Sequence, residues 1–277
     1  MIIGKQNFKT QGHTYVMGIL NVTPDSFSDG GRFDSIDAAL KHTQQMVDAG
    51  ADIIDVGGES TRPGHEKITD QEEMERVVPV IERIKKEFSI PVSLDTYKSA
   101  VAKAGIAAGA DLLNDIWGLQ YDDALGQIVA ESDVAYCLMH NRKQVTEAMD
   151  ADVFIGQMKE DVERALAAGI KKERMIVDPG VGFAKTQEQN LMTIANLDRL
   201  KALGYPVLLG TSRKSVIGYV LDVPVEKRLA GTLATTAAAV NQGCMFVRVH
   251  DVKENVELIQ MMERIRESCL LYTSPSP

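Results

Sequence analysis

Short apolar segments recur along the chain, and each is followed by a polar loop and then by an amphipathic segment. The amphipathic segments place apolar residues at helical spacing, and several end at a glycine, which favours helix termination. The expected strands are residues 16–20, 53–56, 92–94, 112–114, 134–139, 175–177, 207–209 and 245–249. The expected helices are residues 35–49, 70–88, 98–108, 121–131, 152–168, 187–203, 226–242 and 252–267.

Strands that alternate with helices indicate an α/β protein with a parallel sheet and right-handed crossovers. This number of strand–helix units in one domain favours a closed (β/α)8 TIM barrel over residues 15–267. The alternative is an open doubly wound sheet, but no G-x-G-x-x-G motif follows the first strand. Residues 1–14 alternate weakly and include a turn-like segment at 11–13, so we expect a short N-terminal β-hairpin there.

Residues 268–277 interrupt the amphipathic pattern of the preceding helix and show no turn logic. The segment CLLYTSPSP resembles a translated sequencing adapter that follows a shortened reading frame. We expect these residues to be a non-native or disordered tail, with a native disordered tail as the alternative. Neither interpretation gives them a chemical role.

The composition is that of an ordinary globular protein, with 44% hydrophobic and 25% charged residues among 277. A formal net charge of −9 argues against a nucleic-acid partner but leaves room for a small anionic ligand. No segment approaches the roughly 20 apolar residues of a membrane helix, and the first residues lack the apolar core of a signal peptide. Cys137 and Cys244 lie in apolar segments without C-x-x-C spacing, which favours reduced, buried thiols and a cytoplasmic location.

Polar residues follow nearly every expected strand, where a barrel places its functional groups. The first strand ends at Asn21 and opens into a polar loop that contains Pro24, Gly30 and Gly31. That loop could be a plain surface loop with an amide that caps the strand, so the other strand ends decide the question. They carry Asp55, Asp95, Asn114, Asp115, His140, Asn141, Asp178, Ser212, Arg213, Lys214, Arg248 and His250. So many polar groups at one end of a barrel indicate a ligand site rather than helix capping.

The residue types suggest the ligand. Carboxylates at Asp95 and Asp178 suit a flat heterocycle with adjacent N–H donors. Arg248 and His250 alternate on one strand and therefore point to one side, where with Arg62 they would form a cationic patch for phosphate. Asn21 offers an oxygen ligand of the kind that Mg²⁺ uses together with phosphate oxygens. Asp55 could instead be a buried network member, Asp115 a cap, and Arg213 the partner of an acidic residue.

Eight segments carry a family resemblance, and the first two are highly specific. In order they read MGILNVTPDSFSDGG, DVGGESTRPG, SLDT, LNDI, MHNR, VDPGVGF, GTSRKS and RVHD. The chain resembles the dihydropteroate synthases of bacterial folate synthesis from about Met17 to Glu267. The resemblance implies a transferase that condenses 6-hydroxymethyl-7,8-dihydropterin diphosphate with 4-aminobenzoate to give 7,8-dihydropteroate and pyrophosphate.

By motif match, the resemblance also implies the site residues. Asp95, Asn114, Asp178 and Lys214 would hold the pterin, and Asn21 would ligate Mg²⁺. The diphosphate would bind Arg62, Arg248 and His250. The aminobenzoate would lie near Thr61, Pro63, Phe183 and Ser215, with Phe27 closing over it from the first loop.

We expect a dissociative displacement at the pterin methylene, in which cations stabilise the departing diphosphate. Asp95 and Asp178 would stabilise the positive charge on the pterin, and Lys214, Arg248 and His250 complete the expected catalytic set. The alternatives are a pterin-binding methyltransferase domain and a non-catalytic pterin-binding barrel. The family resemblance further implies competition by sulfonamides and a homodimer, while composition and charge lead us to expect no membrane or nucleic-acid partner.

Overall fold

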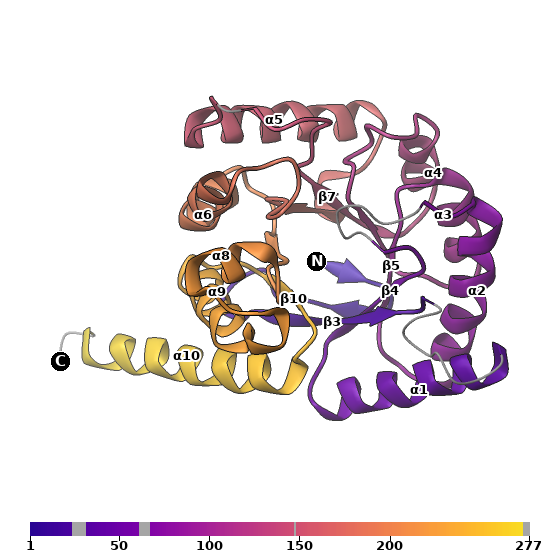
Figure 1. Ribbon diagram of the computed structural model, residues 1–277, viewed down its shortest axis with the longest axis horizontal. Coiled ribbons are helices and arrows are strands. Elements are labelled where there is room, and N and C mark those ends of the chain that lie inside the picture. The colour runs from indigo at the N-terminus through magenta and orange to yellow at the C-terminus, as the bar shows by residue number, and fades with distance from the viewer. Residues whose placement is uncertain (24–31, 61–66, 147, 274–277) are drawn as a thin grey trace.

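In the computed structural model, eight parallel strands form one sheet that curls into a barrel surrounded by helices (Figure 1). The structure describes residues 1–23, 32–60, 67–146 and 148–273. The barrel strands are β3 (Tyr15–Asn21), β4 (Ile53–Gly57), β5 (Val92–Asp95), β6 (Leu112–Asp115), β7 (Ala135–Met139), β8 (Met175–Asp178), β9 (Leu208–Leu209) and β10 (Phe246–Val249). All eight strands that the hydrophobic pattern predicts are therefore present, with ends that shift by at most a few residues.

The sheet order is β8-β7-β6-β5-β4-β3-β10-β9, which is the order of a (β/α)8 barrel cut open between β8 and β9. A single parallel bridge between Val177 and Val207 joins these two edges. The amide of Val177 donates to the carbonyl of Pro206 at 2.9 Å. The TIM-barrel prediction is confirmed, and the open doubly wound sheet is excluded.

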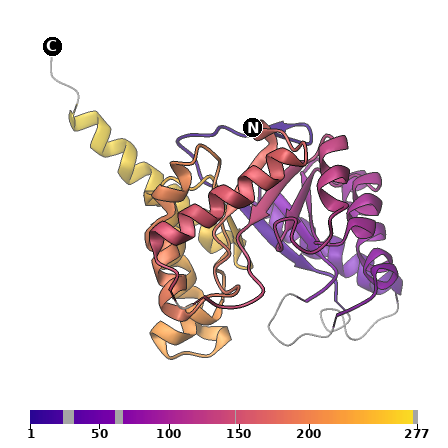
Figure 2. The same ribbon diagram turned by 90° about the horizontal axis from the view of Figure 1, so that it is seen from above.

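The expected hairpin is also present, as the antiparallel strands β1 (Ile2–Ile3) and β2 (Gln6–Asn7). Its turn lies at Gly4 and Lys5 rather than near residues 11–13, because Gly4 adopts the left-handed conformation with φ of +59°. Figure 2 shows the hairpin at one end of the barrel.

The helices cover the outside of the barrel. They are α1 (Arg32–Asp48), α2 (Asp70–Glu87), α3 (Ser99–Ala107), α4 (Leu125–Glu131), α5 (Ala151–Ala167), α6 (Gln187–Ala195), α7 (Leu197–Lys201), α8 (Ser215–Leu221), α9 (Leu229–Asn241) and α10 (Val252–Thr273), with short 3₁₀ turns at Lys172–Arg174 and Val225–Lys227. Among the described residues, no helix is both long enough and apolar enough to cross a membrane.

Several helices differ from expectation for local reasons. The helix expected at 121–131 begins later, since Asp122 accepts bonds from the amides of Ser99 and Ala124 and holds its own segment in a turn. The helix expected at 187–203 breaks at Asn196, whose side chain donates to the carbonyl of Met192. The short α8 was not predicted, and α10 continues past 267 to Thr273 and extends away from the barrel (Figure 2).

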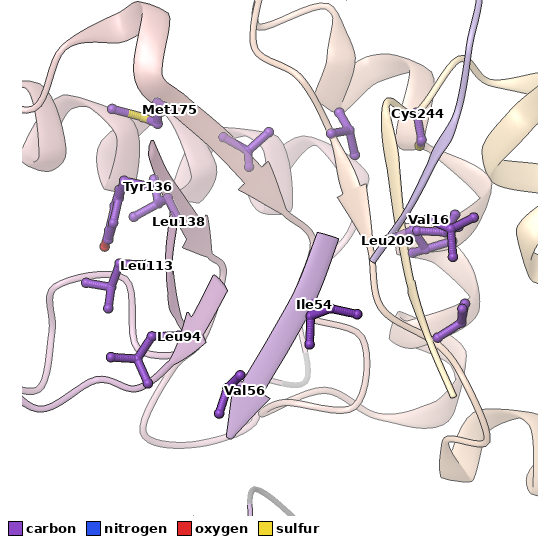
Figure 3. Packing of buried hydrophobic residues seen from close by; sticks show 14 of the residues in the cluster. Val16, Ile54, Val56, Leu94, Leu113, Tyr136, Leu138, Met175, Leu209 and Cys244 are labelled. Carbon is purple, nitrogen blue, oxygen red and sulfur yellow. The ribbon is translucent and has the colours of Figure 1, made fainter. Parts of the chain in front are cut away.

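Two apolar layers result from the alternation of side chains along the strands. Outward residues such as Ile54, Leu94 and Leu113 pack against the helices (Figure 3). Inward residues such as Met17, Ile53 and Phe246 pack with Ile3 and Phe8 of the N-terminal segment and fill the amino-terminal half of the barrel. The carboxyl-terminal half of the interior is left to polar side chains.

Two helix glycines allow a matched test of this packing. A Cβ on Gly105 of α3 would lie 2.2 Å from Cδ2 of the buried Leu94, whereas nothing lies within 4 Å of the same position on Gly156 of α5. We expect Gly105→Ala to lower the free energy of unfolding by about 1–3 kcal/mol through overpacking. Gly156→Ala should raise it by up to about 1 kcal/mol, because alanine is the better helix former. Urea unfolding measures both, and a stability change of the same sign in the two variants would contradict this packing.

Candidate active site

The polar layer of the barrel interior comes from strand ends that sequence analysis singled out. Asp95, Asn114 and Asp178 end or nearly end β5, β6 and β8, and all three are buried. Each follows an inward apolar or small residue two positions earlier, so the period of the strand turns all three toward the barrel axis. The structure therefore brings together the three residues predicted to hold a heterocycle.

Arg248 links this layer across the barrel. Its Nε donates to Oδ2 of Asp55 at 2.6 Å, and its Nη2 donates to Oδ2 of Asp95 at 2.6 Å. Asp55 is fully buried, so its alternative interpretation as a network member is confirmed. Burial alone would lower the pKa of the Arg248 guanidinium, but Asp55 and Asp95 together raise it above its usual range. Arg248 is therefore a fixed positive charge inside the barrel.

Burial weakens two of the acids in this layer, Asp95 and Asp178. Burial raises the pKa of Asp95 to about 7, even though Arg248 favours its charged form. Burial likewise raises the pKa of Asp178, against the opposing effect of Lys214. Among the described residues, Oδ1 of Asp55 and Oγ of Ser93 are buried without a hydrogen-bond partner. The interior thus offers hydrogen-bonding capacity that a polar ligand or water would use.

Lys214 reaches this layer from the segment between β9 and α8. Its ammonium donates to the carbonyl of Val181 at 2.5 Å and lies 4.6 Å from the centre of the Phe183 ring. Burial lowers its pKa to about 8, although Asp178 favours the charged form. Lys214 and Phe183, predicted from different motifs, are therefore neighbours. Ser215 follows as the first residue of α8 and is exposed.

His250 lies just after β10, where its Nδ1 is 3.0 Å from Oγ of Ser212, and that Oγ also accepts from the His250 amide. Arg213 pairs with Asp251 at the outer edge, as its alternative interpretation suggested. Asp115 points away from the interior, because its carboxylate accepts from Tyr136 and from the amides of Trp117 and Leu119. Asp115 is therefore a structural cap rather than a ligand group.

Asn21 ends β3 beside Gly57 of β4. A Cβ on Gly57 would lie 3.6 Å from Oδ1 of Asn21 and 3.8 Å from Oδ2 of Asp95. The amide oxygen of Asn21 and the Asp95 carboxylate thus flank the same point of the barrel interior, and an amide oxygen is a ligand that Mg²⁺ takes beside phosphate oxygens. Among the described residues, no group of three His, Cys, Asp or Glu side chains could hold a metal ion.

Phe27, Thr61, Arg62 and Pro63 lie outside the described residues.

Sequence reasoning missed two buried networks at this end of the barrel. In the first, Glu59 accepts from Tyr97 at 2.5 Å and from Lys98 at 2.6 Å, and Lys98 also pairs with Glu73. In the second, Lys185 contacts His140. Glu59 and His140 lie inside the quoted motifs, and Lys185 lies two residues beyond one, so only their neighbourhood was marked as functional. The pairing itself could not be expected, because charged residues are seldom fully buried and nothing in their spacing indicates it.

The chain matches the family model described as pterin binding enzyme over residues 17–250. It is 53% identical to the dihydropteroate synthase of Clostridium beijerinckii over 266 residues, which cover 96% of this chain and 99% of that relative. Among solved structures, it is similar to a dihydropteroate synthase from Clostridium difficile determined with pteroic acid, with 48% identity, a TM-score of 0.88 and coverage of 96% and 98%. A Yersinia pestis dihydropteroate synthase with a sulfonamide drug has 40% identity, a TM-score of 0.88 and coverage of 97% and 99%.

The buried Asp95 carboxyl should make stability depend on pH. The folded chain holds this proton more tightly than the unfolded chain, so protonation stabilises the fold. That contribution to the free energy of unfolding is fully present below the unfolded-state pKa of 3.8 and is lost as pH rises through the folded-state pKa of about 7. Asn does not titrate, so Asp95→Asn should gain stability relative to the parent chain between pH 5 and 7, at about 1 kcal/mol per pH unit. Urea unfolding at several pH values tests this. Parallel stability curves for the two proteins would show that Asp95 ionises normally.

Proposed function

The chain belongs to the dihydropteroate synthases of the pterin-binding enzyme family, and from that membership we propose how its own residues carry out the family's reaction. The reaction condenses 6-hydroxymethyl-7,8-dihydropterin diphosphate with 4-aminobenzoate and releases pyrophosphate. The chain is thus an enzyme of this condensation, and neither a methyltransferase domain nor a non-catalytic barrel. What remains to be proposed is the role of each residue, the metal, the inhibitors and the assembly.

The pterin would lie deep in the barrel, among Asp95, Asn114, Asp178 and Lys214. One observation carries this placement: the buried carboxyls of Asp95 and Asp178 meet an amide and an ammonium inside a barrel whose amino-terminal half is filled by apolar residues. Ionised carboxylates are acceptors only, so they suit the adjacent N–H groups of a 2-aminopyrimidinone edge. Asn114 can accept and donate, and Lys214 can donate to a ring carbonyl or nitrogen.

The diphosphate would lie nearer the barrel mouth, at His250 and Arg62. Arg248 is also proposed to contact it. Its Nε and Nη2 already donate to Asp55 and Asp95, so this contact falls to Nη1 or requires an exchange of partners. Asn21 would hold Mg²⁺ together with diphosphate oxygens, and this ion would supply charge neutralisation for the leaving group.

The aminobenzoate would lie beside Phe183 and Ser215, with Thr61, Pro63 and Phe27 completing its site. Phe183 supports this placement, because its ring lies against the Lys214 ammonium and so borders the pterin pocket. Sulfonamides would compete here as aminobenzoate mimics. The segment 212–224 has no insertion of the kind found in resistant forms, so we propose that the chain is drug-sensitive.

Chemistry begins at the bond between the pterin methylene and the diphosphate. His250 and Arg62 would stabilise the charge that builds on the leaving group. The reduced pterin ring can release electrons to the methylene, and the nearby carboxylates of Asp95 and Asp178 would stabilise the resulting cation. The aromatic amine then attacks this carbon. Because it is largely neutral at pH 7, its lone pair is available and it needs orientation by the site more than prior removal of a proton. The secondary ammonium that forms then loses its proton to water, which gives the product amine.

A homodimer is part of the proposal. Exposed apolar side chains lie on α8 and α10, and burying them between two copies would remove apolar surface from water. They are Tyr219, Val220, Leu221, Met261 and Ile265. Light scattering should give twice the chain mass of 30.3 kDa, and a mass of one chain would exclude a stable dimer.

The reaction itself has a direct assay. We expect pyrophosphate release from the pterin diphosphate only when both Mg²⁺ and 4-aminobenzoate are present. A sulfonamide should raise the apparent KM for 4-aminobenzoate without lowering kcat. Well-folded protein that gives no turnover, or that hydrolyses the diphosphate equally well without aminobenzoate, would contradict the proposal.

Lys214 provides a test of the pterin placement. Lys214→Ala should lower kcat/KM for the pterin diphosphate by at least about tenfold, or roughly 1.4 kcal/mol, because it removes an ammonium beside Asp178. Lys171→Ala, which removes an exposed ammonium elsewhere, is the matched control. Equal rates for the two variants would remove Lys214 from the site.

A further inference from the structure

Lys185 is a buried lysine that the proposed chemistry does not use. Only 8% of the residue is exposed. Its ammonium is surrounded by four acceptors: Nδ1 of His140 at 2.8 Å and the carbonyls of Gly180, Phe183 and His140 at 3.0, 3.1 and 3.3 Å. An ammonium has only three N–H donors, so this side chain is fully engaged.

Two of these acceptors, the carbonyls of Gly180 and Phe183, belong to one turn between β8 and α6. The Phe183 amide donates to the Gly180 carbonyl at 3.1 Å, and Lys185 binds the carbonyls at both ends of that turn. The backbone here is unusual, since Ala184 has φ of +44°, a region that non-glycine residues seldom adopt. A Cβ on Gly180 would lie only 1.9 Å from the His140 carbonyl. The turn is therefore pressed against the end of β7 and held there by Lys185.

The tautomer of His140 determines whether its ring can accept from Lys185. Its Nε2 lies 2.8 Å from Oε1 of Gln157, an atom that can only accept, so Nε2 carries the proton. Nδ1 is then a free acceptor for the Lys185 ammonium. Burial lowers the pKa of His140 to about 3, which keeps the ring neutral at physiological pH. Gln157 thus fixes the ring in the form that Lys185 requires.

The other side of the same turn faces the site. Val181 accepts from Lys214, and the Phe183 ring lies against the same ammonium. We infer that Lys185, oriented by His140 and Gln157, is a positioning residue that holds the Gly180–Phe183 turn so that Phe183 is correctly placed for the aminobenzoate. This inference rests on the aminobenzoate placement proposed above. It assigns a role to residues outside that placement.

The effect should be selective for one substrate. Asp95 and Asn114 come from other strands and do not depend on the turn. Asp178 and Lys214 contact the turn only through its backbone, at the Gly180 amide and the Val181 carbonyl, and are themselves carried by β8 and by the segment before α8. Phe183 and Val181 depend on the turn itself. Loss of Lys185 should therefore weaken use of aminobenzoate more than it weakens binding of the pterin.

The hydrogen bonding of the turn by Lys185 should also weaken at alkaline pH. Burial lowers the pKa of Lys185 to about 7, with Asp178 opposing this effect. The other charged or titratable groups that face it are His140, Arg142, Asp161 and Lys214. A neutral amine has two donors for four acceptors, so the turn loses a bond when the proton leaves.

Lys185→Met tests the inference, because methionine keeps much of the length but removes every N–H. At pH 6.5 we expect the KM for aminobenzoate to rise at least about tenfold, while the dissociation constant of 6-hydroxymethylpterin rises by less than about threefold. The ratio of the variant's aminobenzoate KM to the parent's should fall as pH rises to 8.5, because the parent's Lys185 then loses its proton and one of its hydrogen bonds. A ratio that stays constant with pH, or a pterin affinity that falls equally, would overturn the inference.

Two further variants keep the outcomes apart. Lys159→Met, at an exposed position on α5, should leave both constants unchanged. Phe183→Ala should raise the aminobenzoate KM; if it does not, the aminobenzoate placement itself fails. If Phe183→Ala has this effect and Lys185→Met does not, only the role of Lys185 is wrong. Should Lys185→Met fail to fold, a parent KM that does not rise from pH 6.5 to 8.5 contradicts the inference.

Discussion

Arg248 donates to Asp55 and Asp95 across the inside of the barrel, and the charge of the whole pocket depends on these two ion pairs. Two buried carboxylates without a nearby cation would be strongly unfavourable, because burial penalises each charge and the two repel each other. One fixed guanidinium allows them to share the site. Even with Arg248 beside it, burial raises the pKa of Asp95 to about 7. N–H donors of a ligand would therefore favour its ionised form.

The barrel makes this arrangement possible through its layers. The N-terminal segment and inward apolar residues such as Met17 and Phe246 fill one half of the interior, so the polar residues gather in the other half. Two lysines then connect that polar half to the β8–α6 turn from opposite sides. Lys214 binds the turn from the pocket, and Lys185 binds it from within the protein. Lys214 belongs to the proposed pterin pocket, whereas Lys185 acts on the same turn from outside the groups expected to touch the substrates.

Sequence reasoning went furthest where a residue's place on a strand determines its direction. Asp95, Asn114 and Asp178 could be placed together, because each follows a short apolar strand and barrel topology brings strand ends to one rim. The engagement of Arg248 with Asp55 could not be predicted, since those residues lie 193 positions apart. The burial of Lys185 and Lys98 was missed for the same reason. A buried lysine needs acceptors from several loops, and the sequence near the lysine does not indicate them. The break at Asn196 escaped because one side-chain bond overrides an otherwise continuous helical pattern.

The central claim is that Asp95, whose pKa burial raises to about 7, accepts the N–H groups of the pterin as a carboxylate. Calorimetric titration with 6-hydroxymethyl-7,8-dihydropterin, in two buffers of different ionisation enthalpy, measures the protons exchanged on binding. At pH 6 we predict release of up to roughly one proton per site, which disappears above pH 8 and is much reduced in Asp95→Asn. Binding that exchanges no protons at pH 6, or the same proton release in Asp95→Asn, would contradict the account.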